Sequence, residues 1–259
     1  MIPTLIGLCT VAGMFAGMLL LLEAGRRLGA RRLAEDPDGV KSGAGAVEGA
    51  VFGLMALLIA FTFSGAATRF DVRRALVIEE ANDIGTAWLR LDLLPVTSQP
   101  PLREKFRDYV DARIAVYAKL PDLAAATIDL NRATALQSEI WQGAVAACRD
   151  SGSSPATMLL LPALNQMIDI TTVRTVAAQT HAPLVIYVML GLLVLAGSLL
   201  AGYDIAIGKH RNWFHSFAFA MIMSLAIYVI LDFEFPRLGL IRVDAYDQVL
   251  LDVRHSMNP

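Results

Sequence analysis

Residues Gly43–Pro95 contain the feature that most constrains the fold, a long stretch that has no proline before its last residue and changes from apolar to charged along its length. The first half is apolar enough to cross a bilayer. The second half is charged, and its apolar residues keep a helical spacing. At 1.5 Å per residue, a helix of this length would span roughly 75 Å, more than twice the ~30 Å hydrocarbon core. The stretch therefore predicts one helix that begins in the membrane and continues well outside it.

Four apolar runs are each long enough to span a bilayer. They are Pro3–Leu22, Gly49–Thr68, Ala182–Tyr203 and Asn212–Leu231. Together they explain a hydrophobic content of 56% and a mean hydropathy of +0.53, since soluble domains are about 45–50% apolar. One extramembrane region of real size remains, Arg69–His181.

The extramembrane region has the pattern of successive helices. Prolines between Pro95 and Pro101, and again at Pro121, separate helical stretches, and Asp122 is suited to cap the helix that follows. No alternating strand pattern is longer than four residues. We therefore predict an all-α membrane protein with four transmembrane helices in two pairs, and a helical extramembrane bundle continuous with the second and third spans.

Four parts follow from this order of elements. Residues 1–68 would hold the first transmembrane pair with a short basic loop, and residues 69–181 the helical bundle. Residues 182–232 would hold the second pair, and residues 233–259 a C-terminal tail. We expect no disulfide between Cys9, in the first span, and Cys148, in the bundle.

The short loops favour one orientation in the membrane. Glu23–Ser42 holds five Lys and Arg residues, and Asp204–Arg211 holds Lys209 and Arg211. The positive-inside rule places both loops in the cytoplasm and the bundle outside. Arginines also flank the other ends of the spans, which leaves the opposite orientation open: Arg69, Arg73, Arg74, Arg237 and Arg242.

The second span has a face of small residues. Gly45, Gly49 and Gly53 recur every four residues, and Ala56, Ala60 and Ser64 continue the row. Small residues at this spacing let another helix approach closely within lipid. We expect this face to pack against neighbouring spans or other protomers.

A second face of the same span carries Glu48, Phe52, Ile59 and Phe63. The simplest interpretation is that these residues touch lipid or neighbouring helices. The functional interpretation is a pore constriction lined by the Phe and Ile side chains, with Glu48 near one mouth. Carboxylates are costly inside a bilayer and mark ion paths there, but Glu48 lies at the edge of the span.

Five acidic residues occur near the membrane exits of the second and fourth spans: Glu79, Glu80, Asp83, Asp232 and Glu234. They can pair with the flanking arginines. Alternatively, they can form an acidic vestibule or a site for calcium or another cation, since calcium takes hard oxygen ligands. A ring of carboxylates would favour cations over anions. The sequence assigns no metal.

Motifs for catalysis are absent from the sequence. It contains no HExxH, CxxC or GxSxG motif and no phosphate-binding glycine loop, and its four histidines have no metal-site spacing. We therefore expect no catalytic residues and no enzyme. The formal net charge of −2 and the absence of a basic patch also argue against nucleic acid as a partner.

Two stretches together resemble one known family. They are AFTFSGAATRFDVRRALVIEEANDIGTAWLRLDLLP (Ala60–Pro95) and LDFEFPRLGLIRVD (Leu231–Asp244). They are similar to bacterial and plastid membrane proteins of unknown function that carry a bestrophin-like domain. The resemblance implies a multi-pass protein of the bacterial cytoplasmic membrane.

Bestrophins are pentameric anion channels, and their second span lines a narrow neck with Phe and Ile. The resemblance therefore implies that Phe52, Ile59 and Phe63 line a pore. Two features differ from bestrophins. The acids after the last span are spread out instead of forming a compact calcium-binding run. The loop charges place the bundle outside, whereas the helical domain of bestrophins is cytosolic.

The sequence thus predicts a homo-oligomeric membrane ion channel whose partners are lipid and inorganic ions. The alternative is a non-conducting membrane scaffold or sensor whose helical bundle binds a partner.

Overall fold

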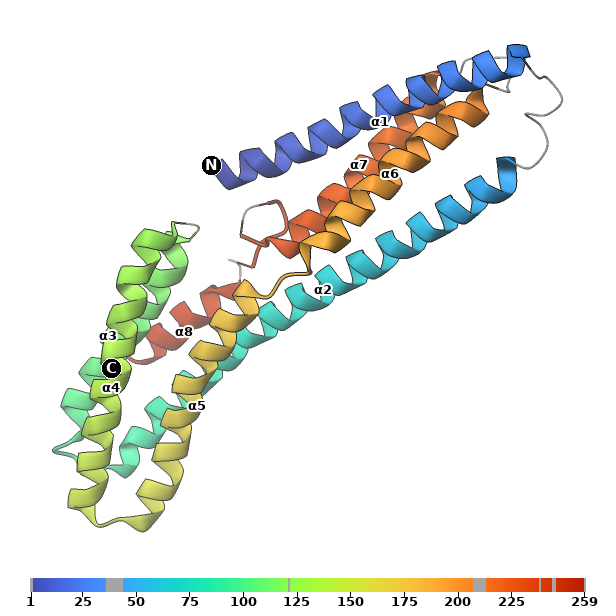
Figure 1. The fold of residues 1–259 in the computed structure, drawn as a ribbon. Helices are drawn as coiled ribbons and strands as arrows, with labels where there is room; N and C mark the ends of the chain where they lie inside the picture. The colour runs from blue at the N-terminus through green and yellow to red at the C-terminus, as the bar shows by residue number, and fades with distance from the viewer. Residues whose placement is uncertain are drawn as a thin grey trace. The chain divides into compact units, whose positions relative to one another are not determined.

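The computed structural model describes residues 2–35, 44–120, 122–206, 213–237, 239–243 and 246–258. The described residues are almost entirely helical and contain no β-strand, which confirms the predicted all-α fold (Figure 1). The helices are α1 (Ile2–Glu35), α2 (Ala44–Arg90), the short 3₁₀ helix η2 (Leu91–Leu93), α3 (Gln99–Lys119), α4 (Leu123–Ser151), α5 (Ser154–Gln179), α6 (Leu184–Ile205), α7 (Trp213–Glu234) and α8 (Gln248–Ser256).

The chain forms two compact units. The first, which we call the membrane unit, comprises Met1–Arg69 and His181–Gly239. The second, the bundle unit, comprises Phe70–Thr180 and Leu240–Pro259. The helix α2 contributes residues to both units, as its unbroken sequence predicts.

The membrane unit contains α1, the first half of α2, α6 and α7. Among the described residues, four helices are long and apolar enough to cross a membrane, one for each predicted span. Their buried side chains form a common core, which includes Met18, Leu22, Met55, Leu190, Val194 and Ile230.

The first helix is longer than predicted. The sequence places a loop from Glu23, whereas α1 continues to Glu35. The Glu23 carboxylate accepts hydrogen bonds from Arg26 and Arg27, one turn away, and such pairs stabilise a helix. The remainder of the predicted loop, residues 36–43, lies outside the described residues, as do Lys209 and Arg211 of the second basic loop.

Glycines bring α1 and α6 together at backbone contact. A Cβ atom placed on Gly25 would lie 1.9 Å from the carbonyl oxygen of Leu199, and one on Gly202 would lie 2.1 Å from that of Leu22. No residue other than glycine fits at either position without a shift of the backbone. The close helix pair in this unit is therefore α1 with α6.

The glycines predicted for helix packing lie elsewhere. A Cβ atom on Gly45, Gly49 or Gly53 would meet nothing within 4 Å, and all three residues are exposed. They pack against no other described helix of the same chain, and their contact with another protomer remains a prediction.

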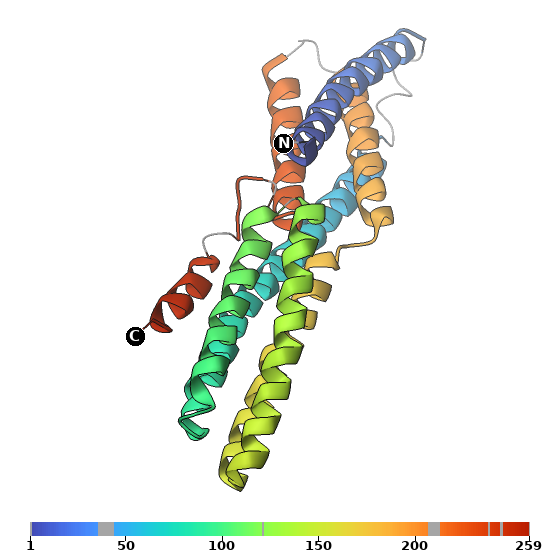
Figure 2. The same ribbon diagram turned by 90° about the vertical axis from the view of Figure 1, so that its left-hand side faces the viewer.

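The bundle unit contains the second half of α2 with α3, α4, α5 and α8 (Figure 2). Local signals set its helix ends. The Asp122 carboxylate accepts a hydrogen bond from the Ala125 N–H at the start of α4, and Gly152, at φ 61°, ends that helix in the left-handed conformation that glycine favours. The core includes Ile84, Phe106, Tyr109, Leu160 and Met167.

The C-terminal residues belong to this bundle. Leu250 and Met257 are buried in its core, and Arg254 forms an ion pair with Asp111 of α3. The end of the chain is thus packed against the helices of residues 70–180.

We expect Gly25→Ala to destabilise the membrane unit, because its methyl group would overlap the Leu199 carbonyl. Overpacking of this kind costs about 1–3 kcal/mol. Thermal unfolding of the purified protein in detergent measures the effect. The control is Gly13→Ala on the same helix, where the methyl group meets nothing within 4 Å; equal melting curves for the two variants would contradict the close contact.

Candidate functional site

The predicted pore face of α2 lies partly against α7. The Phe52 ring meets Phe219 edge-on, with centroids 6.3 Å apart, and Phe63 meets Phe233 in the same way at 5.6 Å. Ile59 is half-buried beside the core, whereas Phe63 remains 42% exposed. The aromatic contacts hold the two rings in place and leave one side of Phe63 uncovered.

Glu48 lies near one end of the membrane unit. It is half-buried, and its carboxylate is close enough to Asp204 for the two charges to repel. Asp204 directly follows the apolar run of α6, so Glu48 stands at the membrane boundary. This position suits a pore mouth better than a mid-membrane ion site.

The buried carboxylate of Glu234 ends α7 and has several partners. Arg69 donates to both of its oxygens, with the shortest distance 2.6 Å. His181 Nδ1 lies 3.0 Å from Oε1, and the Ala182 N–H donates to the same oxygen at 3.2 Å. Glu234 thus links α2 and the start of the third span to α7. Its ion pair with Arg69 agrees with the interpretation that the acids pair with the flanking arginines.

Asp232 is buried two residues before the end of α7. A Cβ atom on Gly239 would lie 1.2 Å from its Oδ1. The chain after Pro236 therefore passes over this carboxylate, and a larger residue in place of Gly239 would force the carboxylate to move.

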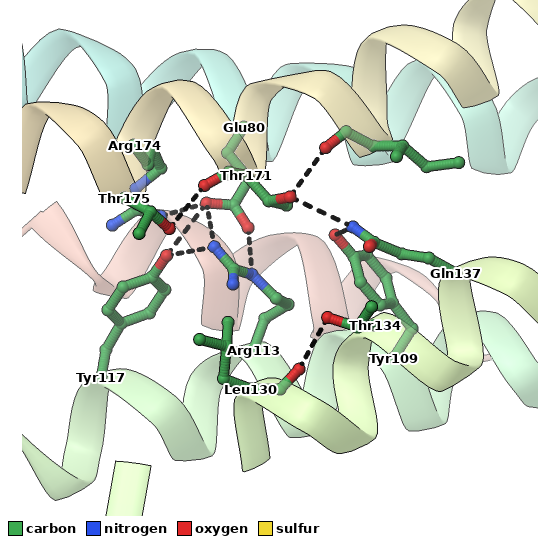
Figure 3. Close-up of polar contacts among 11 residues, drawn as sticks. Glu80, Tyr109, Arg113, Tyr117, Leu130, Thr134, Gln137, Thr171, Arg174 and Thr175 are labelled. Atoms are coloured by element: carbon green, nitrogen blue, oxygen red, sulfur yellow. Dashed lines mark hydrogen bonds and ion pairs between the residues drawn. The ribbon is translucent and has the colours of Figure 1, made fainter. Parts of the chain in front are cut away.

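A second buried carboxylate, Glu80, organises the bundle unit (Figure 3). Arg113 of α3 donates to its two oxygens at 2.6 and 3.1 Å, and Arg174 of α5 forms an ion pair with Oε2. The Tyr117 hydroxyl donates to Oε2 at 3.3 Å, and its ring lies 4.0 Å from the Arg174 guanidinium carbon. One carboxylate from α2 thus links α3 and α5.

The charges of this cluster shift the pKa of Glu80. Burial raises the pKa of the Glu80 carboxyl, but the two guanidiniums lower it by more, so that it stays below its ordinary value. Nearby, Gln137 of α4 donates to the Tyr109 hydroxyl at 3.2 Å and to Thr171 at 3.4 Å. Burial raises the pKa of the Tyr109 phenol.

The other two predicted acids of the bundle unit differ from Glu80. Glu79 is exposed and Asp83 is half-buried. Burial, together with repulsion from Glu79 and Glu80, raises the pKa of Asp83. Within the described ranges, no three His, Cys, Asp or Glu side chains are grouped so that they could hold a metal ion.

Arg73 stabilises the C-terminal end of α5. This buried side chain donates to the carbonyl oxygens of Ala177 and Thr180 at 3.0 and 2.8 Å. Carbonyls in the last turn of a helix have no partner within the helix, and a cation there complements the helix dipole. The basic residues after the second span thus fill structural positions.

These features define an all-helical membrane protein with four spanning helices and a helical bundle. The sequence matches the Bestrophin-like domain family over residues 12–246, so the chain belongs to that family. Its fold is similar to that of a bacterial bestrophin homologue from Klebsiella pneumoniae, with a TM-score of 0.70 over 95% of this chain and 98% of that one, at 15% sequence identity. A comparison with curated proteins finds no match.

The sequence pattern does not indicate that Arg113, Arg174 or His181 are the partners of the acids. A signal was present for Arg113, because Phe106, Tyr109, Val110 and Val116 place it on the apolar face of α3. A charged residue on an apolar helix face needs a buried counter-charge. The sequence alone could not show that Glu80 supplies it.

Replacing Glu80 by alanine leaves two buried guanidiniums without their counter-charge. We expect a loss of about 3–5 kcal/mol of stability, as for other broken buried ion pairs. Chemical unfolding in detergent, followed by circular dichroism, measures it. Glu79→Ala removes an exposed carboxylate one residue away and should change stability little; equal losses would show that burial of Glu80 has no special weight.

The lowered pKa of Glu80 also predicts a pH dependence. Its contribution to stability is present above the unfolded-state pKa of about 4.5 and is lost as the pH falls through the folded-state pKa. Melting temperatures of the parent and Glu80→Gln between pH 7 and pH 4 test this. The parent should lose more stability on acidification than the variant. Asp83, whose raised pKa gives the opposite slope, is present in both proteins, but its slope is smaller in the variant because the charge of Glu80 contributes to that rise. Parallel profiles would contradict the assignment.

Proposed function

We propose that the protein is an oligomeric membrane ion channel whose pore is lined by α2. The observation that carries the proposal is the exposure of α2 along its apolar half in a member of the bestrophin-like family. One face holds Gly45, Gly49 and Gly53 with no neighbour within 4 Å. A spanning helix with such a face contacts either lipid or a helix of another chain. The small residues favour a helix as the partner.

In this proposal, Phe52, Ile59 and Phe63 form the constriction and gate by dewetting. Their contacts with α7 support the role, because a ring held by Phe219 or Phe233 keeps a fixed position. The small-residue face packs the protomers of a homo-oligomer, and Glu48 stands at one mouth. The permeating species are inorganic ions, and the surrounding medium is the lipid of a bacterial cytoplasmic membrane.

An acidic vestibule in this proposal depends on Glu79 and Asp83. Glu80 and Glu234 are neutralised by arginine within their own units, so they add little negative charge at a mouth. Glu79 and Asp83 supply the hard oxygens that calcium or another cation prefers. The selectivity that follows is a preference for cations.

A second candidate function is a non-conducting scaffold or sensor. Large apolar side chains on the bundle unit favour it, since Val96 is 81% exposed, Met158 72% and Leu89 67%. Where such residues form a contiguous patch, the patch is typical of a protein contact site. In this function the bundle binds a partner and the spans only anchor it.

Ion flux from purified protein in liposomes tests the channel, with potassium, chloride and calcium gradients compared. Truncation of both rings in the Phe52→Ala/Phe63→Ala variant should raise the conductance, because it widens the constriction. The control is Phe61→Ala, which removes a 67% exposed ring from another face of α2.

Unchanged currents in the double variant would contradict the assignment of the pore. No flux under any gradient, from protein shown to be folded and oligomeric, would favour the scaffold. The size of the complex in detergent separates the two functions further, since a channel lined by one helix per protomer needs several copies.

A further inference from the structure

A groove between α1 and α6 in the membrane unit has a volume of about 510 Å³. Its apolar part is lined by Leu28, Leu199 and Leu200. Its polar part is lined by Arg31, Arg32, Glu35 and Tyr203. An apolar wall beside a basic end matches the two parts of a phospholipid.

The contacts between the two helices place the groove at the membrane boundary. The apolar run of α6 ends at Tyr203, and Asp204 follows. A Cβ atom on Gly29 would lie 2.6 Å from the Tyr203 carbonyl oxygen, so Gly29 is level with that boundary. At 1.5 Å rise per residue, Arg31 and Arg32 lie about 3–5 Å beyond it, at the depth of lipid headgroups.

The arginines of α1 differ in whether an acidic residue pairs with them. Arg26 and Arg27 are both paired with Glu23. Arg31 and Arg32 are exposed and have no ion-pair partner among the residues that the structure describes. Glu35 offsets one of the two charges, which leaves a net positive charge at the polar end of the groove. Basic pockets between spanning helices are suited to anionic headgroups.

We propose that this groove binds an anionic phospholipid of the membrane. Arg31 and Arg32 contact the phosphate, the Tyr203 hydroxyl donates a hydrogen bond to the headgroup, and one acyl chain lies along Leu28, Leu199 and Leu200. The groove lies outside the proposed pore face, since all its lining residues belong to α1 and α6 and none to α2.

Binding of phosphatidylglycerol to the purified full-length protein in detergent tests the proposal, with native mass spectrometry counting the bound lipids. Phosphatidylcholine tests the need for negative charge, and inorganic phosphate tests whether the headgroup alone suffices. We expect Arg31→Gln/Arg32→Gln to weaken phosphatidylglycerol binding about thirtyfold. Arg31→Lys/Arg32→Lys should retain most of it, which also shows that the helix tolerates changes at these positions.

Arg132→Gln/Arg149→Gln is the matched control, because it removes two exposed arginines from α4. We expect this control to bind phosphatidylglycerol like the parent, and Leu200→Trp, which fills the apolar part, to bind it weakly. Equal binding of phosphatidylglycerol and phosphatidylcholine would overturn the proposal. So would an equal loss in the α4 control, or inorganic phosphate displacing the lipid at equimolar concentration.

Discussion

The bundle unit depends on the neutralisation of charge away from water. A carboxylate or guanidinium that leaves water loses several kcal/mol of hydration, and only a close partner of opposite charge restores it. Glu80 offers that partner to Arg113 and Arg174 at once. Because the three residues come from α2, α3 and α5, the requirement for pairing fixes the relative rotation of three helices, which apolar contacts alone specify less sharply.

The membrane unit is built on a different principle. Lipid tails are as apolar as leucine, so burial of apolar side chains gives the spans little reason to associate with one another. Association of α1 and α6 comes from the contact of their backbones, which Gly25 and Gly202 permit. The helix α2 joins its neighbours through longer side chains, including Phe52 and Met55. The glycines of α2 stay exposed. The membrane unit thus combines a closely packed pair, α1 and α6, with a helix, α2, whose glycine face is open.

The fold was predictable because its signals are local. Twenty apolar residues, a proline, or an Asp before a helix each act within one segment, and the predicted spans and the Asp122 cap are confirmed. The extension of α1 to Glu35 was missed because Glu23 looks like the end of an apolar run. In the structure, it is the partner of Arg26 and Arg27.

The candidate site was less predictable, because its contacts join residues far apart in the sequence. The acids were identified, and Arg69 stood among the partners considered for Glu234. Arg113 and Arg174 were not among these partners, because the register between helices decides which arginine meets which acid. The spacing of small residues also does not distinguish Gly49 from Gly25. Gly49 has no neighbour within 4 Å, whereas Gly25 lies against the backbone of α6.

The continuity of α2 has a mechanical consequence. Two connections join the membrane unit to the first part of the bundle unit, and they differ in stiffness. On one side, α2 runs through without a break from Ala44 to Arg90. On the other, the helical hydrogen bonding stops between Gln179 and Leu184, at Pro183. A continuous α-helix is stiffer than a segment whose helical hydrogen bonding is interrupted, so α2 is the more rigid of the two connections. The membrane unit and the first part of the bundle unit are thus joined by one continuous helix and by one connection in which the helix is interrupted.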